Sequence, residues 1–193
     1  MGEVIRSTAT ENTFHWISTI LSLVMGLGAT RLLSGLIIAF RMRRTAPLDW
    51  IPVVWAGIIF LAMVQFWWAI HDLPGTAHRL GFATYTLLVG LILLLFASAG
   101  LLLPGAESKS HTSLRGFFQD EGRYGLLALA GYYTLALFAN VALFQANPVS
   151  REMLVLIPML ALPIMAFFAR RKMQAAITLI YVLLAVYDAV VAQ

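Results

Sequence analysis

The chain is divided into six long apolar runs separated by shorter polar segments. An α-helix needs about 20 mostly apolar residues to cross a bilayer, and the runs are of that length. Strands of a transmembrane barrel would be only about 10 residues long with alternating polarity, and no run alternates in that way. The pattern therefore predicts an all-α integral membrane protein, a single domain of residues 1–193 with six transmembrane helices. The expected spans are Phe14–Phe40, Trp50–Ile70, Gly81–Leu103, Tyr124–Gln145, Met153–Ala169 and Met173–Val191.

Composition supports a membrane protein. Hydrophobic residues make up 61% of the 193 residues and charged residues only 11%, whereas a soluble domain carries about 25% charged residues. The net charge of +4 does not indicate nucleic-acid binding, because the positive residues lie in short links between apolar runs. The lipid bilayer is the expected environment, and no nucleic-acid partner is expected. The absence of cysteine excludes disulfides and thiol catalysis.

The positive residues are distributed unevenly among the links. Nine of the 13 Lys and Arg residues follow spans one, three or five, three lie in the N-terminal segment and the other links, and Arg31 lies inside a span. Lys and Arg favour the cytoplasmic side of a membrane, so both termini are expected to face outward. The first 13 residues are polar and the run after them is too long for a signal-peptide core, which predicts a retained first span.

Span one combines a charge with small residues. Arg31 shares a helix face with Gly28, Ser34 and Gly35, and small neighbours leave room for an anion, a carboxylate or a lipid headgroup. Alternatively, Arg31 extends to the cytoplasmic interface or pairs with a backbone carbonyl. The small residues favour close helix packing, so span one is expected to be the central contact helix and leucine-rich span three to face lipid. The expected packing residues are Ser18, Ser22, Gly26, Gly28, Thr30, Ser34 and Gly35.

Span six carries a polar stripe on one helix face. Gln174, Thr178, Tyr181 and Asp188 recur at three- and four-residue steps, with small Ala185 between them. By helical rise, Gln65 in span two and Asn140 in span four lie at about the depth of Asp188. Such a polar layer would either coordinate a cation or relay protons, or form an ordinary cluster of interhelical hydrogen bonds. The candidate binding or pore residues are Arg31, Gln65, Asn140, Thr178, Tyr181 and Asp188.

Three further features lead to structural expectations. The tryptophans of span two are expected to be interfacial anchors, because aromatic rings favour the water boundaries of a bilayer; they are Trp50, Trp55, Trp67 and Trp68. The link Pro104–Arg123 is expected to be a plain loop, with an amphipathic surface helix as the alternative. Pro158 and Pro163 predict kinks in span five, either static or acting as a hinge.

Motifs for catalysis are lacking in the sequence. There is no GxSxG, no phosphate-binding glycine loop with lysine and no HExxH. His15, His71 and His78 are expected at the outer surface as polar caps rather than metal ligands, and His111 as a solvated residue. We expect no catalytic residue, no metal and no cofactor, and an enzyme is the least favoured function.

The segments Met25–Gly35 (MGLGATRLLSG) and Gln65–Trp68 (QFWW) resemble parts of a family of small bacterial multi-span inner-membrane proteins. The resemblance covers spans one and two only and brings no activity with it. It implies a multi-pass protein of the bacterial inner (cytoplasmic) membrane.

Two functions follow as expectations. The first is a channel or transporter for an ion or small solute that acts as a homo-oligomer, with Asp188 and its polar neighbours lining an outer vestibule. The second is a membrane scaffold or sensor subunit that binds a partner protein or lipid through its small-residue and polar faces. Such a partner would lie in the membrane or the cytoplasm.

Overall fold

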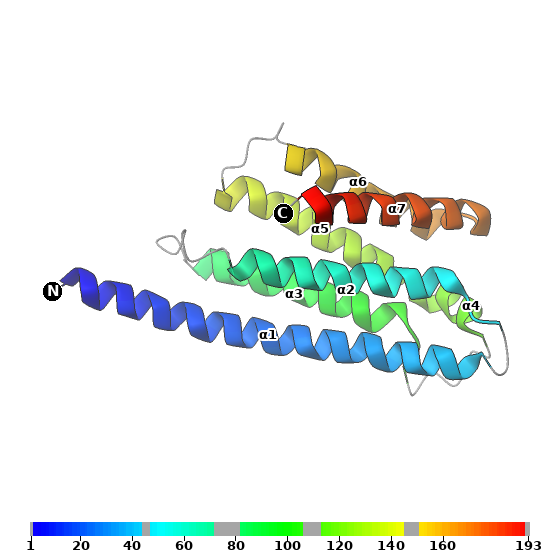
Figure 1. Ribbon diagram of the computed structural model, residues 1–193, viewed down its shortest axis with the longest axis horizontal. Coiled ribbons are helices and arrows are strands. Elements are labelled where there is room, and N and C mark those ends of the chain that lie inside the picture. Colours follow the sequence, from blue (N-terminus) through cyan, green and yellow to red (C-terminus); the bar gives the residue numbers. More distant parts are fainter. Residues whose placement is uncertain (1, 44–46, 72–81, 106–112, 145–150, 192–193) are drawn as a thin grey trace.

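Residues 2–43, 47–71, 82–105, 113–144 and 151–191 are described by the computed structural model of the protein, and no strand occurs in these ranges. Six long helices alternate in direction along the chain, so each lies antiparallel to the next (Figure 1). The elements are α1 (Gly2–Met42), α2 (Trp50–His71), α3 (Phe82–Leu102), α4 (Leu114–Phe117), the π-helical turn η2 (Phe118–Gly122), α5 (Tyr124–Phe144), α6 (Arg151–Phe168) and α7 (Arg171–Val191).

Four of the helices contain a segment that is long and apolar enough to cross a membrane. These segments are Ser18–Met42, Trp50–Ile70, Phe82–Leu102 and Tyr124–Val141. α6 contributes a shorter apolar segment, Val155–Phe168. The prediction of an all-α chain is confirmed for the described residues, and the apolar helices are consistent with a membrane protein. The first helix is longer than expected, because it begins at Gly2 and not at Phe14, and its first turns extend past the ends of the other helices (Figure 1).

Five helices form a closed ring, and α1 packs outside it. Neighbours around the ring are α2, α3, α5, α6 and α7, with α7 returning to α2, while α1 contacts α3 and α2. The expectation that span one is central was therefore wrong. Span three is also not mainly lipid-facing, because Leu91, Leu95, Ala99 and Leu102 are buried. In a bundle whose surface is as apolar as its core, composition alone does not separate lipid-facing from buried helices.

Two glycines let η2 and α5 pack closely against the backbone of α3. The hydroxyl of Ser98 donates to the carbonyl of Gly125 (2.8 Å). A Cβ atom at Gly125 would lie 2.9 Å from the Ser98 carbonyl oxygen, and one at Gly122 would lie 2.7 Å from that of Leu102. Glycine at these two positions therefore lets the two helices meet backbone to backbone.

The link before α5 contains a short helical cap instead of the expected loop. Ser113 begins α4, its hydroxyl accepting from the N–H of Gly116 (3.1 Å). Leu114, Phe117 and Phe118 are buried, whereas Arg115, Asp120 and Glu121 are exposed. The apolar side of the cap thus packs into the end of the bundle rather than lying on a headgroup layer.

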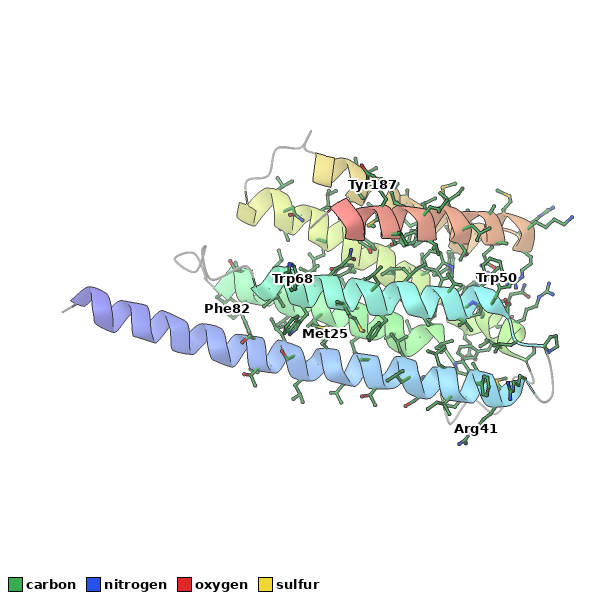
Figure 2. The ribbon with its side chains drawn as sticks, viewed as in Figure 1. Met25, Arg41, Trp50, Trp68, Phe82 and Tyr187 are labelled. Atoms are coloured by element: carbon green, nitrogen blue, oxygen red, sulfur yellow. The ribbon has the colours of Figure 1, made fainter. Side chains whose placement is uncertain are left out.

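The tryptophans of α2 divide into two kinds. Trp50, Trp67 and Trp68 are exposed near the helix ends, as anchors would be, and Figure 2 shows Trp50 and Trp68 at opposite ends of the helix. Trp55 is fully buried, so the expectation of an interfacial anchor was wrong for this residue. α6 continues as one helix through Pro158 and Pro163.

Candidate functional site: a polar seam between α2 and α7

The polar face of α7 is turned inward, as its sequence period predicts. Gln174, Thr178, Tyr181 and Ala185 are buried, and Asp188 is partly buried. The opposite face of the helix is apolar and exposed, as Leu183 illustrates. The buried face is directed toward α2 and α6, the two helices that pack against α7.

Polar side chains link α2 and its N-terminal cap to α7 at three levels. The linked residues are 122, 123 and 123 positions apart in sequence, so the parallel helices stay in register along their length. The distance from the first level to the last is about 25 Å by helical rise, close to the hydrocarbon thickness of about 30 Å. We call this column the α2–α7 seam; its bridges are Arg171 to Asp49, Trp55 to Thr178 and Gln65 to Asp188.

The bridge at the Asp49 end of the seam is called the inner bridge, after the side expected to face the cytoplasm. It is an ion pair beside the N-terminus of α2. Asp49 Oδ1 accepts the backbone N–H of Ile51 (3.0 Å), as an N-terminal capping residue does. The same oxygen accepts Nη2 of Arg171, the first residue of α7. The Asp49 side chain is only 2% exposed and that of Arg171 is 27% exposed. Asp49 Oδ2 and Arg171 Nη1 are buried without a hydrogen-bond partner, so the pair is joined through one atom of each group.

The middle bridge is a chain of neutral hydrogen bonds. The indole N–H of Trp55 donates to Thr178 Oγ1 (3.0 Å), and that hydroxyl donates to the carbonyl of Gln174 (2.7 Å). The amide of Gln174 in turn donates to the carbonyl of Ala166 in α6 (3.1 Å). All four residues are buried, so this level joins α2, α7 and α6 tightly.

Between the middle and outer levels lies the buried hydroxyl of Tyr181. Tyr181 is 0% exposed and packs its ring against Trp55, with centroids 4.8 Å apart. Its hydroxyl lies within hydrogen-bonding reach of the Tyr133 hydroxyl of α5, although the contact does not have normal hydrogen-bond geometry. Tyr133 stacks edge to face with Tyr132. A buried hydroxyl costs free energy unless it is paired, and the Tyr133 hydroxyl is the polar group placed to pair with it.

The outer bridge joins two of the three residues predicted to share a polar layer. The amide of Gln65 donates to Asp188 Oδ2 at 2.9 Å. Asn140 does not take part, because its amide donates to the carbonyl of Ala136 in its own helix (2.9 Å). The seam therefore has a carboxylate at each end, Asp49 at one and Asp188 at the other.

Arg31 lies apart from the seam and does not pair with Asp188. Its Nη2 donates to the carbonyls of Gly100 and Leu103 (3.2 Å each), and its Nη1 approaches that of Pro104 (3.4 Å). The carbonyl of Gly100 would normally accept from residue 104, but proline has no N–H. Arg31 thus supplies donors to the C-terminus of α3, the backbone-carbonyl alternative foreseen for it.

The small residues of α1 differ in how far they are buried. Gly28 and Gly35 are buried; their missing Cβ atoms would lie 2.6 Å from the Cε of Met63 and from the Cβ of Leu103, respectively. Gly26 has no neighbour within 4 Å. Ser18 is partly buried. The members of the row that are exposed are Ser22, Gly26, Thr30 and Ser34.

Three seam residues were not among the candidates from sequence. Asp49 lies in a link and drew no prediction, Arg171 entered only the count of positive residues, and Trp55 was assigned to the membrane interface. One signal was present: Asp49, Trp55 and Gln65 precede Arg171, Thr178 and Asp188 by a nearly constant interval.

No match to the chain is found among protein-family models, curated proteins or solved structures. Among the side chains that the structure describes, no group of three His, Asp or Glu is placed to hold a metal ion. The side chains of His15 and His71, together with His78 and His111, lie outside the described part.

Proposed function

We propose that the protein is a transporter or channel for a small cation, with the α2–α7 seam as its route. One observation carries the proposal: three polar bridges in register over about 25 Å, with the buried hydroxyl of Tyr181 between two of them. Polar groups at membrane depth are costly and mark ion pathways and proton relays. A carboxylate at each end of the route favours a positive species over an anion.

Buried residues close the seam in this conformation. Trp55, Thr178 and Tyr181 are all fully buried, so passage of a cation requires α7 to move relative to α2. Arg31 is not a residue of this route, because its guanidinium is bound to the end of α3. Asn140 is not a residue of the seam, because its amide donates within α5, whereas Asp188 is the outer site.

Flux in proteoliposomes tests the proposal directly. Purified protein is reconstituted, and Na⁺, K⁺ and H⁺ gradients are imposed one at a time. Asp188→Asn is expected to lower the conducted flux at least about tenfold, the effect of about 1.4 kcal/mol on a rate-limiting step. Glu121→Gln, a change at an exposed acid outside the seam, should leave the flux unchanged. Absence of flux for all three ions, or equal flux in Asp188→Asn, rejects the route.

We further propose six spans with outward termini in a bacterial inner membrane. The helix ends that carry Arg41, Arg115, Arg123 and Arg171 lie at one end of the bundle (Figure 1), which supports a cytoplasmic orientation for that end. Cysteine scanning tests this, because the chain has no thiol of its own. A cysteine added after Gln193 should react with an impermeant maleimide in intact cells, and Arg115→Cys should react only after lysis.

A second function, a scaffold subunit, is favoured by the outer face of α1. α1 lies outside the ring, and Ser22, Gly26, Thr30 and Ser34 are exposed on it. Small residues allow another transmembrane helix to approach closely, so a second copy or a partner protein would bind here. Under this function Gly26→Leu abolishes co-purification of the partner or a homo-oligomer, while Asp188→Asn has no effect on it.

A further inference from the structure

We infer that Asp49 is the inner cation-binding residue and that Arg171 is a tethered counter-cation which occupies this site in the closed form. The inference deepens the proposed function, because it names a second site on the same route. The ligand class is a monovalent cation, the proton included. The argument uses the burial of Asp49, the incomplete pairing of the two side chains and their place in the seam.

Asp49 is a buried carboxylate with unused binding capacity. Its side chain is 2% exposed, and Oδ2 has no hydrogen-bond partner while Oδ1 serves both Ile51 and Arg171. A structural Arg–carboxylate pair is frequently bidentate, with two parallel hydrogen bonds. A carboxylate held through one oxygen keeps the other available for a second cation.

The guanidinium of Arg171 is suited to dissociate from Asp49. Its side chain is 27% exposed, more than ten times the exposure of Asp49. Nη1 has no partner, so departure breaks one contact to Asp49 only. The flanking Arg170 and Lys172 are exposed, and among the described residues Arg171 is the charged group that contacts Asp49. An arriving cation replaces the guanidinium, which moves toward water at the end of the bundle.

The position of Asp49 connects it to the route. It lies about 9 Å by helical rise below Trp55, whose indole closes the middle of the seam. A cation bound at Asp49 therefore lies next to the Trp55–Thr178 level, which must open for the cation to pass. Exchange of a mobile cation for a tethered one also keeps the buried carboxylate compensated, since an unpaired buried charge is strongly destabilising.

Thermal unfolding of purified full-length protein tests the site without any flux measurement. Arg171→Gln removes the tethered cation, so its unfolding temperature should rise by about 3–6 °C when NaCl, KCl or acid brings a cation to about ten times its dissociation constant. Choline chloride at equal ionic strength is the salt control. The double variant Asp49→Asn/Arg171→Gln removes both charges and should not respond. A response of equal size in the double variant, or none in Arg171→Gln, overturns the inference.

Flux separates this inference from the proposed function. Arg171→Gln should conduct at least as fast as the native protein, and Asp49→Asn should lose flux. Cation-dependent stabilisation of Arg171→Gln without flux in the native protein rejects the proposed function but retains the site. Native flux that persists in Asp49→Asn rejects the site but retains the function. Glu121→Gln again serves as the matched exposed acid.

Discussion

Replacement of Arg31 by methionine should destabilise the bundle through the end of α3. Methionine keeps most of the aliphatic stem, so packing changes little, but all donors to Gly100, Leu103 and Pro104 are lost. The carbonyl of Gly100 is then left without a donor, because its helical partner is Pro104. Arg31 also joins α1 to the ring, so the loss weakens the contact between α1 and α3.

The expected loss of unfolding free energy in Arg31→Met follows from the hydrogen bonds of Arg31. A hydrogen bond that involves a charged group contributes about 1.5–3 kcal/mol. The three bonds of Arg31 are long, at 3.2–3.4 Å, and part-buried, so the lower end applies and water partly replaces them. A total loss of about 2–4 kcal/mol is expected, which for a chain of this size lowers the unfolding temperature by roughly 4–16 °C.

The assay is thermal unfolding in one detergent, followed by the monodispersity of the soluble fraction. Arg41→Met is the matched control, since Arg41 is an exposed arginine near the end of the same helix, and it should cost less than about 0.5 kcal/mol. Arg31→Lys should fall between native protein and Arg31→Met, because one ammonium replaces a fork of donors. Equal unfolding temperatures for Arg31→Met and Arg41→Met would refute the capping role of Arg31. A loss of flux without a loss of stability would show that Arg31 takes part in cation passage.

Three other substitutions test the packing and the seam in the same unfolding assay. Gly35→Ala places a Cβ 2.6 Å from the Cβ of Leu103 and should cost about 1–3 kcal/mol, whereas Gly26→Ala meets open space and should gain up to about 1 kcal/mol in helix propensity; similar effects at both positions would contradict the placement of α1. Tyr181→Phe removes a buried hydroxyl that makes no hydrogen bond of normal geometry and should leave stability unchanged or raise it by about 1 kcal/mol, so a clear loss would mean that the hydroxyl has a partner. Thr178→Val leaves a buried indole N–H unpaired and should cost about 1–3 kcal/mol; a neutral result would show that this bond is not made.

The face of α7 could be predicted from sequence because its polar residues follow the helical period. Gln174, Thr178 and Tyr181 fall on one side and the exposed side carries Leu, Ile and Val, so the inward face is determined before any partner is known. The same reasoning could not identify α2 as the helix that packs against this face of α7. α2 is apolar on all sides, and nothing in its periodicity separates buried Trp55 from the exposed tryptophans.

Charged residues in links were harder to interpret than those in spans. Asp49 drew no prediction from the sequence, yet it is buried. Arg31 drew attention as a charge at membrane depth, and its partners depend on which carbonyls lack donors. Pro104 was the available clue, because a proline four residues after Gly100 predicts a carbonyl in need of a donor. Which helix would supply it depends on tertiary packing.

The register between α2 and α7 also determines when the bundle can be completed during biosynthesis. Residues that bridge the two helices are 122 or 123 positions apart, so α2 enters the bilayer long before its polar side chains have partners. α7 carries the partner of each bridge, so α2 and α7 depend on each other for these polar contacts. The seam is thus completed only once α7 has been synthesised and packs against α2. A chain halted before Arg171 would lack the α7 partners of Asp49, Trp55 and Gln65.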